Sequence, residues 1–235
     1  MEINLKKRPN NPVIIEGFPG FGLIGSIATE FLIQHLNCEL IGTHWFEKLP
    51  ATIAVHDGKI IKPLNIYYNE EHNMVIIHAI SGGQGLEWEI SDFILQLAKE
   101  LNAREIVSLE GVGSSEEKEE SKVYYVTSDD SKKEHLGKLG VQELKEGIIV
   151  GVTSALIMKS DMPITAFFAE THSELPDSKA AAKAVESLNA YLDLKIDPKP
   201  LLEQAEKFEK KLNSILDKTS STQKQIKKNQ LSYVG

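Results

Sequence analysis

Four short, almost entirely apolar runs constrain the fold of this chain more than any other feature. They are VIIE at residues 13–16, MVIIHAI at 74–80, EIVSL at 105–109 and ITAFFA at 164–169. Such runs are typical of strands buried on both faces, because a strand with one solvated face alternates apolar and polar residues. Stretches with helical spacing separate the runs. Buried strands that alternate with helices predict an α/β fold, with a mostly parallel sheet flanked by helices on both faces.

The remaining elements follow from periodicity and turn signals. Two more strands are expected at residues 123–127 and 148–152, and several short, antiparallel strands across residues 39–68, where turn signals recur. We predict helices over residues 23–36, 87–102, 132–139, 154–158 and 177–192. The glycine-rich stretches at residues 81–85 and 111–115 are expected to be loops at the ends of two sheet strands.

The chain divides into a core and two C-terminal segments. Residues 1–196 form the predicted α/β core domain, and 235 residues are enough to bury about 70% of the unfolded surface. Residues 197–217 form a predicted C-terminal helix with Asp197 as its N-cap and a heptad-like apolar seam. Residues 218–235 form a predicted flexible tail, because residues 218–230 are almost all Lys, Gln, Ser, Thr and Asn.

Composition excludes several classes of function. The net charge is −8 and the body carries no run of Lys and Arg, which argues against a nucleic-acid partner. Cys38 is the single cysteine, so no intrachain disulfide forms, in keeping with a reducing cytoplasm. The sequence contains neither a signal-peptide core nor an apolar run of about 18 residues. We therefore expect a soluble, cytoplasmic protein with no membrane partner.

The last residues, NQLSYVG, are apolar and aromatic where a polar end would be ordinary. Leu231, Tyr233 and Val234 follow the polar stretch directly, as a peptide presented to a partner would. The alternative is that these residues fold back onto the body, since single apolar residues often lie on protein surfaces.

The loop GFPGFGLIG is the most conspicuous motif for a ligand. Gly20, Gly22 and Gly25 have the spacing of a dinucleotide fingerprint between a predicted strand and a predicted helix, and Gly17 precedes them. Against a nucleotide, Gly17-Phe-Pro lies between the strand and the first required glycine, and two phenylalanines occupy the loop. A tight apolar turn packed under a neighbouring element is the stronger interpretation.

Catalytic and metal motifs are absent from the sequence. No G-x-S-x-G elbow, P-loop, H-E-x-x-H or paired-cysteine pattern occurs, and Ser81 and Ser114 have no identifiable partner base. His78 lies within a predicted buried strand, which favours a hydrogen-bonded core residue over a base. Glu170 and His172 lack a third ligand nearby. We predict no catalytic residue, no metal and no cofactor.

Several segments, taken in order, resemble one family. GFPGFGLIG, AISGGQG, SLEGVG, GVTSALIM and ELPDSKAAAKAVESLNAYLDL are similar to the archaeal branch of the proteasome assembly chaperones, relatives of the second subunit of the eukaryotic chaperone pair. The resemblance covers about residues 10–216. It implies a three-layer α/β fold akin to nucleoside phosphorylases, no catalytic activity, self-assembly into a homo-oligomer, and binding to the α ring of the 20S proteasome.

The resemblance also assigns a role to the C-terminus. The tail is similar to the hydrophobic-Tyr-any-residue ending of proteasome activators, which inserts between α subunits. It implies that Leu231, Tyr233, Val234 and the carboxylate of Gly235 bind the partner. This sequence departs from the pattern, because Tyr233 is third from the end and not second. The alternative function is an enzyme or ligand-binding protein that takes a nucleotide or nucleoside in the crevice of the Gly-rich loops.

Overall fold

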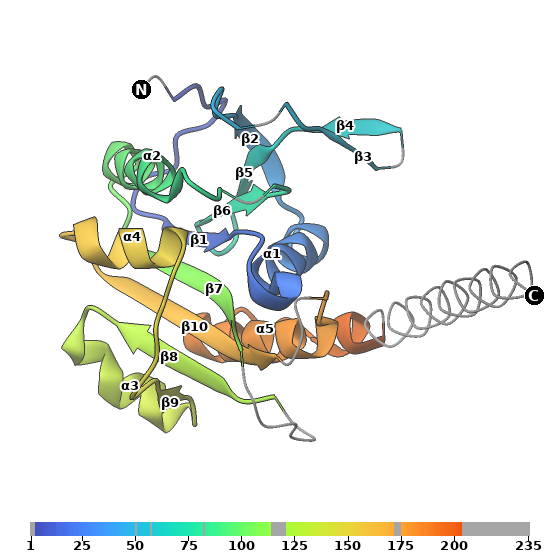
Figure 1. The fold of residues 1–235 in the computed structure, drawn as a ribbon. Helices are drawn as coiled ribbons and strands as arrows, with labels where there is room; N and C mark the ends of the chain where they lie inside the picture. Colours follow the sequence, from blue (N-terminus) through green and yellow to red (C-terminus); the bar gives the residue numbers. More distant parts are fainter. Residues whose placement is uncertain are drawn as a thin grey trace, which may run out of the picture.

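The computed structural model describes residues 3–49, 51–56, 58–81, 83–113, 121–171 and 175–203. Within them the chain forms one eight-stranded sheet, in the order β2-β5-β6-β1-β7-β10-β8-β9, and a separate two-stranded hairpin, β3-β4. Figure 1 shows the sheet as the middle layer, with helices on both of its faces. The expected three-layer α/β fold is confirmed.

Parallel pairing is confined to the centre of the sheet and one edge. The pairs β6-β1, β1-β7, β7-β10 and β8-β9 are parallel, whereas β2-β5, β5-β6 and β10-β8 are antiparallel. The strands are β1 (Val13–Gly17), β2 (Glu39–His44), β3 (Ala54–His56), β4 (Lys59–Ile61), β5 (Leu64–Asn69), β6 (Met74–Ala79), β7 (Glu105–Gly113), β8 (Val123–Thr127), β9 (Gln142–Glu143) and β10 (Ile164–Thr171).

The helices divide between the two faces of the sheet. They are α1 (Ile24–His35), α2 (Glu87–Glu100), α3 (Lys133–Lys138), α4 (Val152–Lys159) and α5 (Ser178–Leu192). Helices α2 and α4 cover one face, and α1 and α5 cover the other. Because successive side chains of a strand point to opposite faces, Ile14 packs on the α2 side and Ile15 on the α1 side. The central strands therefore bury side chains on both faces, which explains why their sequences are continuous apolar runs.

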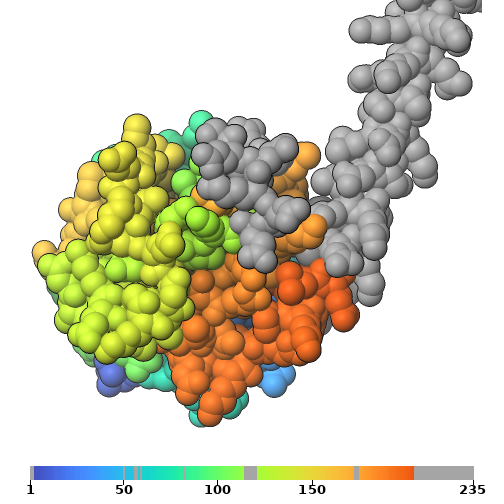
Figure 2. All heavy atoms as spheres, turned by 90° about the horizontal axis from the view of Figure 1, so that it is seen from below, coloured from blue at the N-terminus to red at the C-terminus, as the bar shows by residue number. Residues whose placement is uncertain are grey.

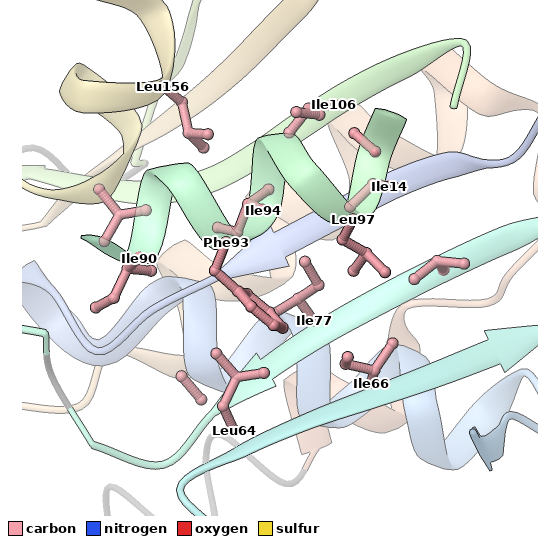
Figure 3. Packing of buried hydrophobic residues seen from close by; sticks show 14 of the residues in the cluster. Ile14, Leu64, Ile66, Ile77, Ile90, Phe93, Ile94, Leu97, Ile106 and Leu156 are labelled. Atoms are coloured by element: carbon pink, nitrogen blue, oxygen red, sulfur yellow. The ribbon is translucent and has the colours of Figure 1, made fainter. Parts of the chain in front are cut away.

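The core under α2 is built from one helical stripe. Ile90, Phe93, Ile94 and Leu97 recur at helical spacing, and all four are buried. Figure 3 shows these side chains directed at the sheet, where they meet residues of β1, β5, β6 and β7. Burial of this stripe fixes the position of α2 over the sheet.

On the opposite face of the sheet, small residues let helices α1 and α5 pack closely. Ala180, Ala181 and Ala184 of α5 are fully buried and pack with Ile24 of α1, so the two helices approach closely. The Asp177 side chain caps α5 by accepting a hydrogen bond from the Ala180 backbone N–H at 2.9 Å. In Figure 2 the segment that carries β8, α3 and β9 (yellow-green) lies beside α5 (orange) on one face of the molecule.

The expected strand at residues 148–152 is wrong. Residues 148–151 are irregular, and α4 begins at Val152. Both edges of β10 are already paired, with β7 and β8, so the apolar run finds no open edge in the centre of the sheet. Gly151, at φ 100°, then turns the chain into α4. The side chains of Ile148 and Val150 are left 91% and 78% exposed.

Two other boundaries differ from expectation. Strand β7 runs to Gly113, so residues 111–113 belong to the sheet and not to a loop. Its extension pairs with β10, which ends at Thr171. Of the expected helix at 197–217, residues 199–203 are helical, and the remainder lies outside the described residues together with the tail at 218–235. In the part of the chain that the structure describes, no helix is long and apolar enough to cross a membrane.

The antiparallel strands expected across residues 39–68 are present, and two of them leave the sheet. Strands β3 and β4 form a hairpin that projects from the body in Figure 1. Val55 and Ile60 are cross-strand partners, and their side chains are 66% and 68% exposed. The exposure of Val55 and Ile60 shows that the described body does not cover these side chains. An isolated two-stranded hairpin has little stability of its own.

Candidate functional site

The glycine loop GFPGFGLIG connects β1 to α1, and its glycines are packed by the chain itself. A Cβ atom on Gly17 would lie 2.2 Å from the Gly25 carbonyl oxygen, and one on Gly25 would lie 2.4 Å from the Leu109 carbonyl oxygen. Here the backbone of the loop approaches the backbone of α1 and of β7. Gly25 thus packs the start of α1 against β7, and Gly17, which precedes the fingerprint glycines, packs against Gly25.

The two middle glycines have different roles. Gly22 lies at φ 64°, a left-handed conformation that favours glycine, inside the single 3-10 turn before α1. A Cβ atom on Gly20 would lie 2.9 Å from Oε2 of Glu110, so Gly20 makes room for a carboxylate of this chain. These contacts agree with the packed-turn interpretation of the motif.

The described parts of the three glycine-rich segments meet at one cavity of about 550 Å³. Gly20, Gly83 and Gly111 all line it, at the carboxyl-terminal end of β7 and beyond the ends of β1 and β6. In open α/β sheets, ligands bind at this end of the strands. Ser81 does not line the cavity, and Ser114 and Ser115 lie outside the described residues.

Irregular residues 147–151 cover the cavity from the other side. The segment crosses in front of the sheet from β9 to α4 (Figure 1), and all five of its residues line the cavity. The apolar run that the sequence assigned to a strand therefore forms a wall of the cavity.

A pair of carboxyl groups, Glu16 and Glu110, lies next to this cavity. Glu16, on β1, is fully buried, whereas Glu110, on β7, is partly exposed and lines the cavity. The Thr153 hydroxyl of α4 lies 3.2 Å from Glu16 Oε1 and 3.0 Å from Glu110 Oε1. Ser108 donates a hydrogen bond to Glu16 Oε1, while Glu16 Oε2 is buried without a hydrogen-bond partner in the described structure.

Burial raises the pKa of both carboxyl groups. For Glu110 the charge of Glu16 raises the pKa further, and the hydrogen bond from Thr153 opposes this only in part. For Glu16 the hydrogen bonds from Ser108 and Thr153 oppose the effect of burial in part. The single proton of Thr153 satisfies both carboxyl contacts only if one carboxyl is protonated and donates to the hydroxyl oxygen. The pair therefore retains a proton at a pH where an exposed pair would be fully ionised.

Sequence reasoning missed Glu16, Glu110 and Thr153. The available signal was the acidic residue that ends the apolar run VIIE, and a second one directly after EIVSL. Two carboxylates at the ends of buried strands are unusual, because a charge is rarely buried without a partner. What the sequence could not give was that β1 and β7 are neighbours in the sheet.

The other sequence-predicted residues fall in separate places. His78 is buried in β6, within 2.9 Å of the Thr29 hydroxyl, and burial lowers its pKa, so it is the hydrogen-bonded core residue that was expected. Among the described residues no group of three or more His, Cys, Asp or Glu side chains is placed to hold a metal ion. Leu231, Tyr233, Val234 and Gly235 lie outside the described residues.

Comparison with known proteins gives consistent relatives across the whole body. The model of the PAC2 family matches residues 14–216. A crystal structure of Pyrococcus furiosus PbaA, described as an archaeal homolog of proteasome-assembly chaperone, is 30% identical with a TM-score of 0.82 and covers 97% of this chain and 98% of its own. P. furiosus PbaB, described as an archaeal proteasome activator, is 23% identical with a TM-score of 0.77, over 91% of this chain and 98% of its own.

A similar protein also occurs in a second organism. The uncharacterized protein MJ0106 of Methanocaldococcus jannaschii is 27% identical over 212 residues, which are 88% of this chain and 86% of that protein. The likeness to PbaB is a likeness of fold, because its sequence identity is lower.

Gly17→Ala should destabilise the protein strongly. The new Cβ would meet the Gly25 carbonyl at 2.2 Å, and this backbone contact leaves no side chain free to move away. We expect the free energy of unfolding to fall by about 3 kcal/mol or more, at the upper end of overpacking effects. Urea denaturation measures it. Gly137→Ala in α3, where the new Cβ meets nothing within 4 Å, is the matched control. Equal stability of the two variants would contradict the packed-turn interpretation.

Glu110→Gln should stabilise the protein at high pH only. A carboxyl with a raised native pKa binds more protons in the native than in the unfolded state, so wild-type stability falls as pH rises from about 4.3 through the native pKa. Glutamine removes this loss. We expect the free energy of unfolding at pH 8 to rise by about 1 kcal/mol or more, and the difference to vanish near pH 4.

Urea denaturation at pH 4, 6 and 8 tests this pH dependence. Glu134→Gln, the same change on an exposed α3 carboxylate, should alter stability little at any of these pH values. A variant less stable than the wild type at pH 8 would show that Glu110 is ionised and favourably paired in the native protein.

Proposed function

Because the chain belongs to the PAC2 family, we propose that it is a proteasome-assembly chaperone or adaptor that binds the α ring of the 20S proteasome through its C-terminal peptide. The observation that carries the proposal is the similarity to P. furiosus PbaA, which spans nearly the full length of both chains. The family is one of proteasome assembly chaperones and activators. The proteasome partner implies that the protein acts in the cytoplasm.

The sequence of the C-terminus supports the docking peptide. Residues 218–230 are polar, with four lysines and no acid, and NQLSYVG ends the chain with Leu231 and Tyr233. A polar tether of about 13 residues has a root-mean-square reach of roughly 20 Å. Such a tether lets the tip reach a groove on the partner while the folded body stays in place. The lysines favour approach to an acidic surface.

Self-association would make this weak contact effective. A single short peptide binds weakly, because ordering the peptide consumes much of the free energy that its buried side chains return. Several tails on one homo-oligomer raise the affinity through effective concentration. We therefore propose that the protein is a homo-oligomer that binds the α ring through more than one tail.

The β3-β4 hairpin is the surface that best supports self-association. Val55 and Ile60 are exposed side by side, and Trp45 and Ile53 at the base of the hairpin are also exposed and line an apolar hollow. Contiguous exposed apolar residues on a soluble body are typical of protein interfaces. A neighbouring copy that covers this surface would bury the hairpin that the body leaves unpacked.

We propose that the protein has no catalytic activity. The described residues that line the cavity at Glu110 include no Ser, Cys, His, Lys or Arg side chain. The support for the proposal is the similarity to proteins described as a proteasome-assembly chaperone homolog and a proteasome activator.

Deletion of residues 231–235 should abolish capture of the α ring. The proposed anchor is removed, while the body, which lies within residues 3–203, keeps its folded structure. Co-sedimentation of the purified protein with 20S α subunits measures capture, and circular dichroism checks the fold. Tyr233→Ala should weaken capture and Ser232→Ala should not. Undiminished capture by the truncated protein would refute docking through the tail.

Replacing Val55 and Ile60 together by glutamate should dissociate the homo-oligomer. Two adjacent charges in a buried interface cost far more than the lost apolar contact, because their desolvation is unfavourable. Size-exclusion chromatography with light scattering gives the mass. Met158→Glu, at an exposed position of α4, is the control, since Met158 is 64% exposed. An unchanged mass of the hairpin variant would remove this surface as the interface.

A further inference from the structure

We propose that the cavity at Glu110 is a binding site for a small organic cation, a primary ammonium or guanidinium group on an apolar stem. The site is separate from the C-terminal peptide and does not depend on the proteasome partner. Its volume, about 550 Å³, lies within the range of small-molecule sites.

The charges around the cavity select the sign of the ligand. Glu110 forms part of its base and Glu87, at the start of α2, part of its wall, and no Lys, Arg or His is among the described lining residues. A phosphate or carboxylate ligand would be repelled and would find no cationic partner. A cation would be attracted by both carboxyl groups.

The walls supply the apolar part of the site. Phe18, Phe21 and Phe168 come from the β1-α1 loop and from β10, and Ile149 and Val152 from the segment that covers the cavity and from α4. Aliphatic stems are favourably buried against such side chains, and aromatic rings attract organic cations. An apolar wall with a carboxyl group at its base is the arrangement that an alkylammonium or alkylguanidinium ion requires.

The carboxyl pair behind the wall is incompletely satisfied. Glu16 Oε2 is buried without a hydrogen-bond partner among the described residues, and the Thr153 hydroxyl is the one contact common to Glu16 and Glu110. Glu105, a buried carboxylate elsewhere, shows the contrast: Thr165 and Tyr191 donate to it at 2.6 and 2.8 Å, and Lys132 pairs with it. Glu105 is thus compensated by a cation, whereas the pair at the cavity has no cationic partner among the described residues.

Binding of a cation to the pair has a proton signature. Thr153 of α4 hydrogen-bonds Glu110, and the charge of Glu16 on β1 acts on it. Val152, Phe168 and Glu87 line the same cavity, and no described lining residue is basic. Lys145 precedes the cavity-covering segment, but it pairs with Glu143 and does not line the cavity. A bound ammonium favours the ionised carboxylate, so binding releases the proton that the pair retains.

Titration calorimetry with n-butylammonium and n-butylguanidinium chlorides tests the site in the full-length protein at pH 7. We expect saturable binding, a raised melting temperature, and an observed enthalpy that differs between phosphate and MOPS buffers because a proton is released. Butyrate and adenosine monophosphate are the probes of opposite charge and should not bind. Saturable binding of either anion would overturn the proposal, and so would a failure of both cations to bind saturably.

Two variants locate the site. Glu110→Gln should weaken cation binding by about tenfold or more, and Glu134→Gln should leave it unchanged. Gly20→Ala is a second, independent variant, because its Cβ would lie 2.9 Å from Glu110 Oε2 and displace the carboxylate; it should weaken binding as well. Circular dichroism confirms that each variant is folded. Wild-type affinity in a folded Glu110→Gln or Gly20→Ala variant would place the cation elsewhere and refute the assignment.

Discussion

The structure depends on the close approach of one backbone to another at three glycines. Gly17 faces Gly25, Gly25 faces the Leu109 carbonyl, and Gly111 faces the Phe21 carbonyl, with room for no Cβ at any of them. These contacts draw the start of α1 down onto β1 and β7. The connection between β1 and α1 then passes directly over the carboxyl ends of the strands, and it sets the shape of everything built there.

One consequence is the carboxyl pair. Residues 16 and 110 lie just beside these glycines on adjacent parallel strands, so their side chains leave the sheet on the same face and meet under α4. Burying two acids together costs free energy that a Leu or Met pair would not. Glu105, another buried carboxylate, pairs with Lys132, whereas Glu16 and Glu110 have no cationic partner among the described residues.

Two segments outside the main sheet carry exposed apolar side chains, Val55 and Ile60 in one and Ile148 and Val150 in the other. The β3-β4 hairpin leaves the edge of the sheet, and residues 147–151 cross its end without joining a ladder. Both carry β-branched side chains that elsewhere in this chain lie in strands. Each segment therefore has the composition of a core element but lies at the surface, which is typical of interaction sites.

The sequence by itself determined the layers: fully apolar runs such as VIIE indicate strands buried on both faces, and the stripe on α2 indicates a helix with one buried face. It also carried the family resemblance, through the order of its motifs. The tertiary structure decided which strands are neighbours. Residues 148–151 do not join the sheet, because β7 and β8 occupy both edges of β10. Folding also places Glu16 close to Glu110, which is 94 positions later in the sequence. Periodicity reports the environment of one segment, whereas pairing depends on competition among all of them, and that competition is settled only when the chain is folded.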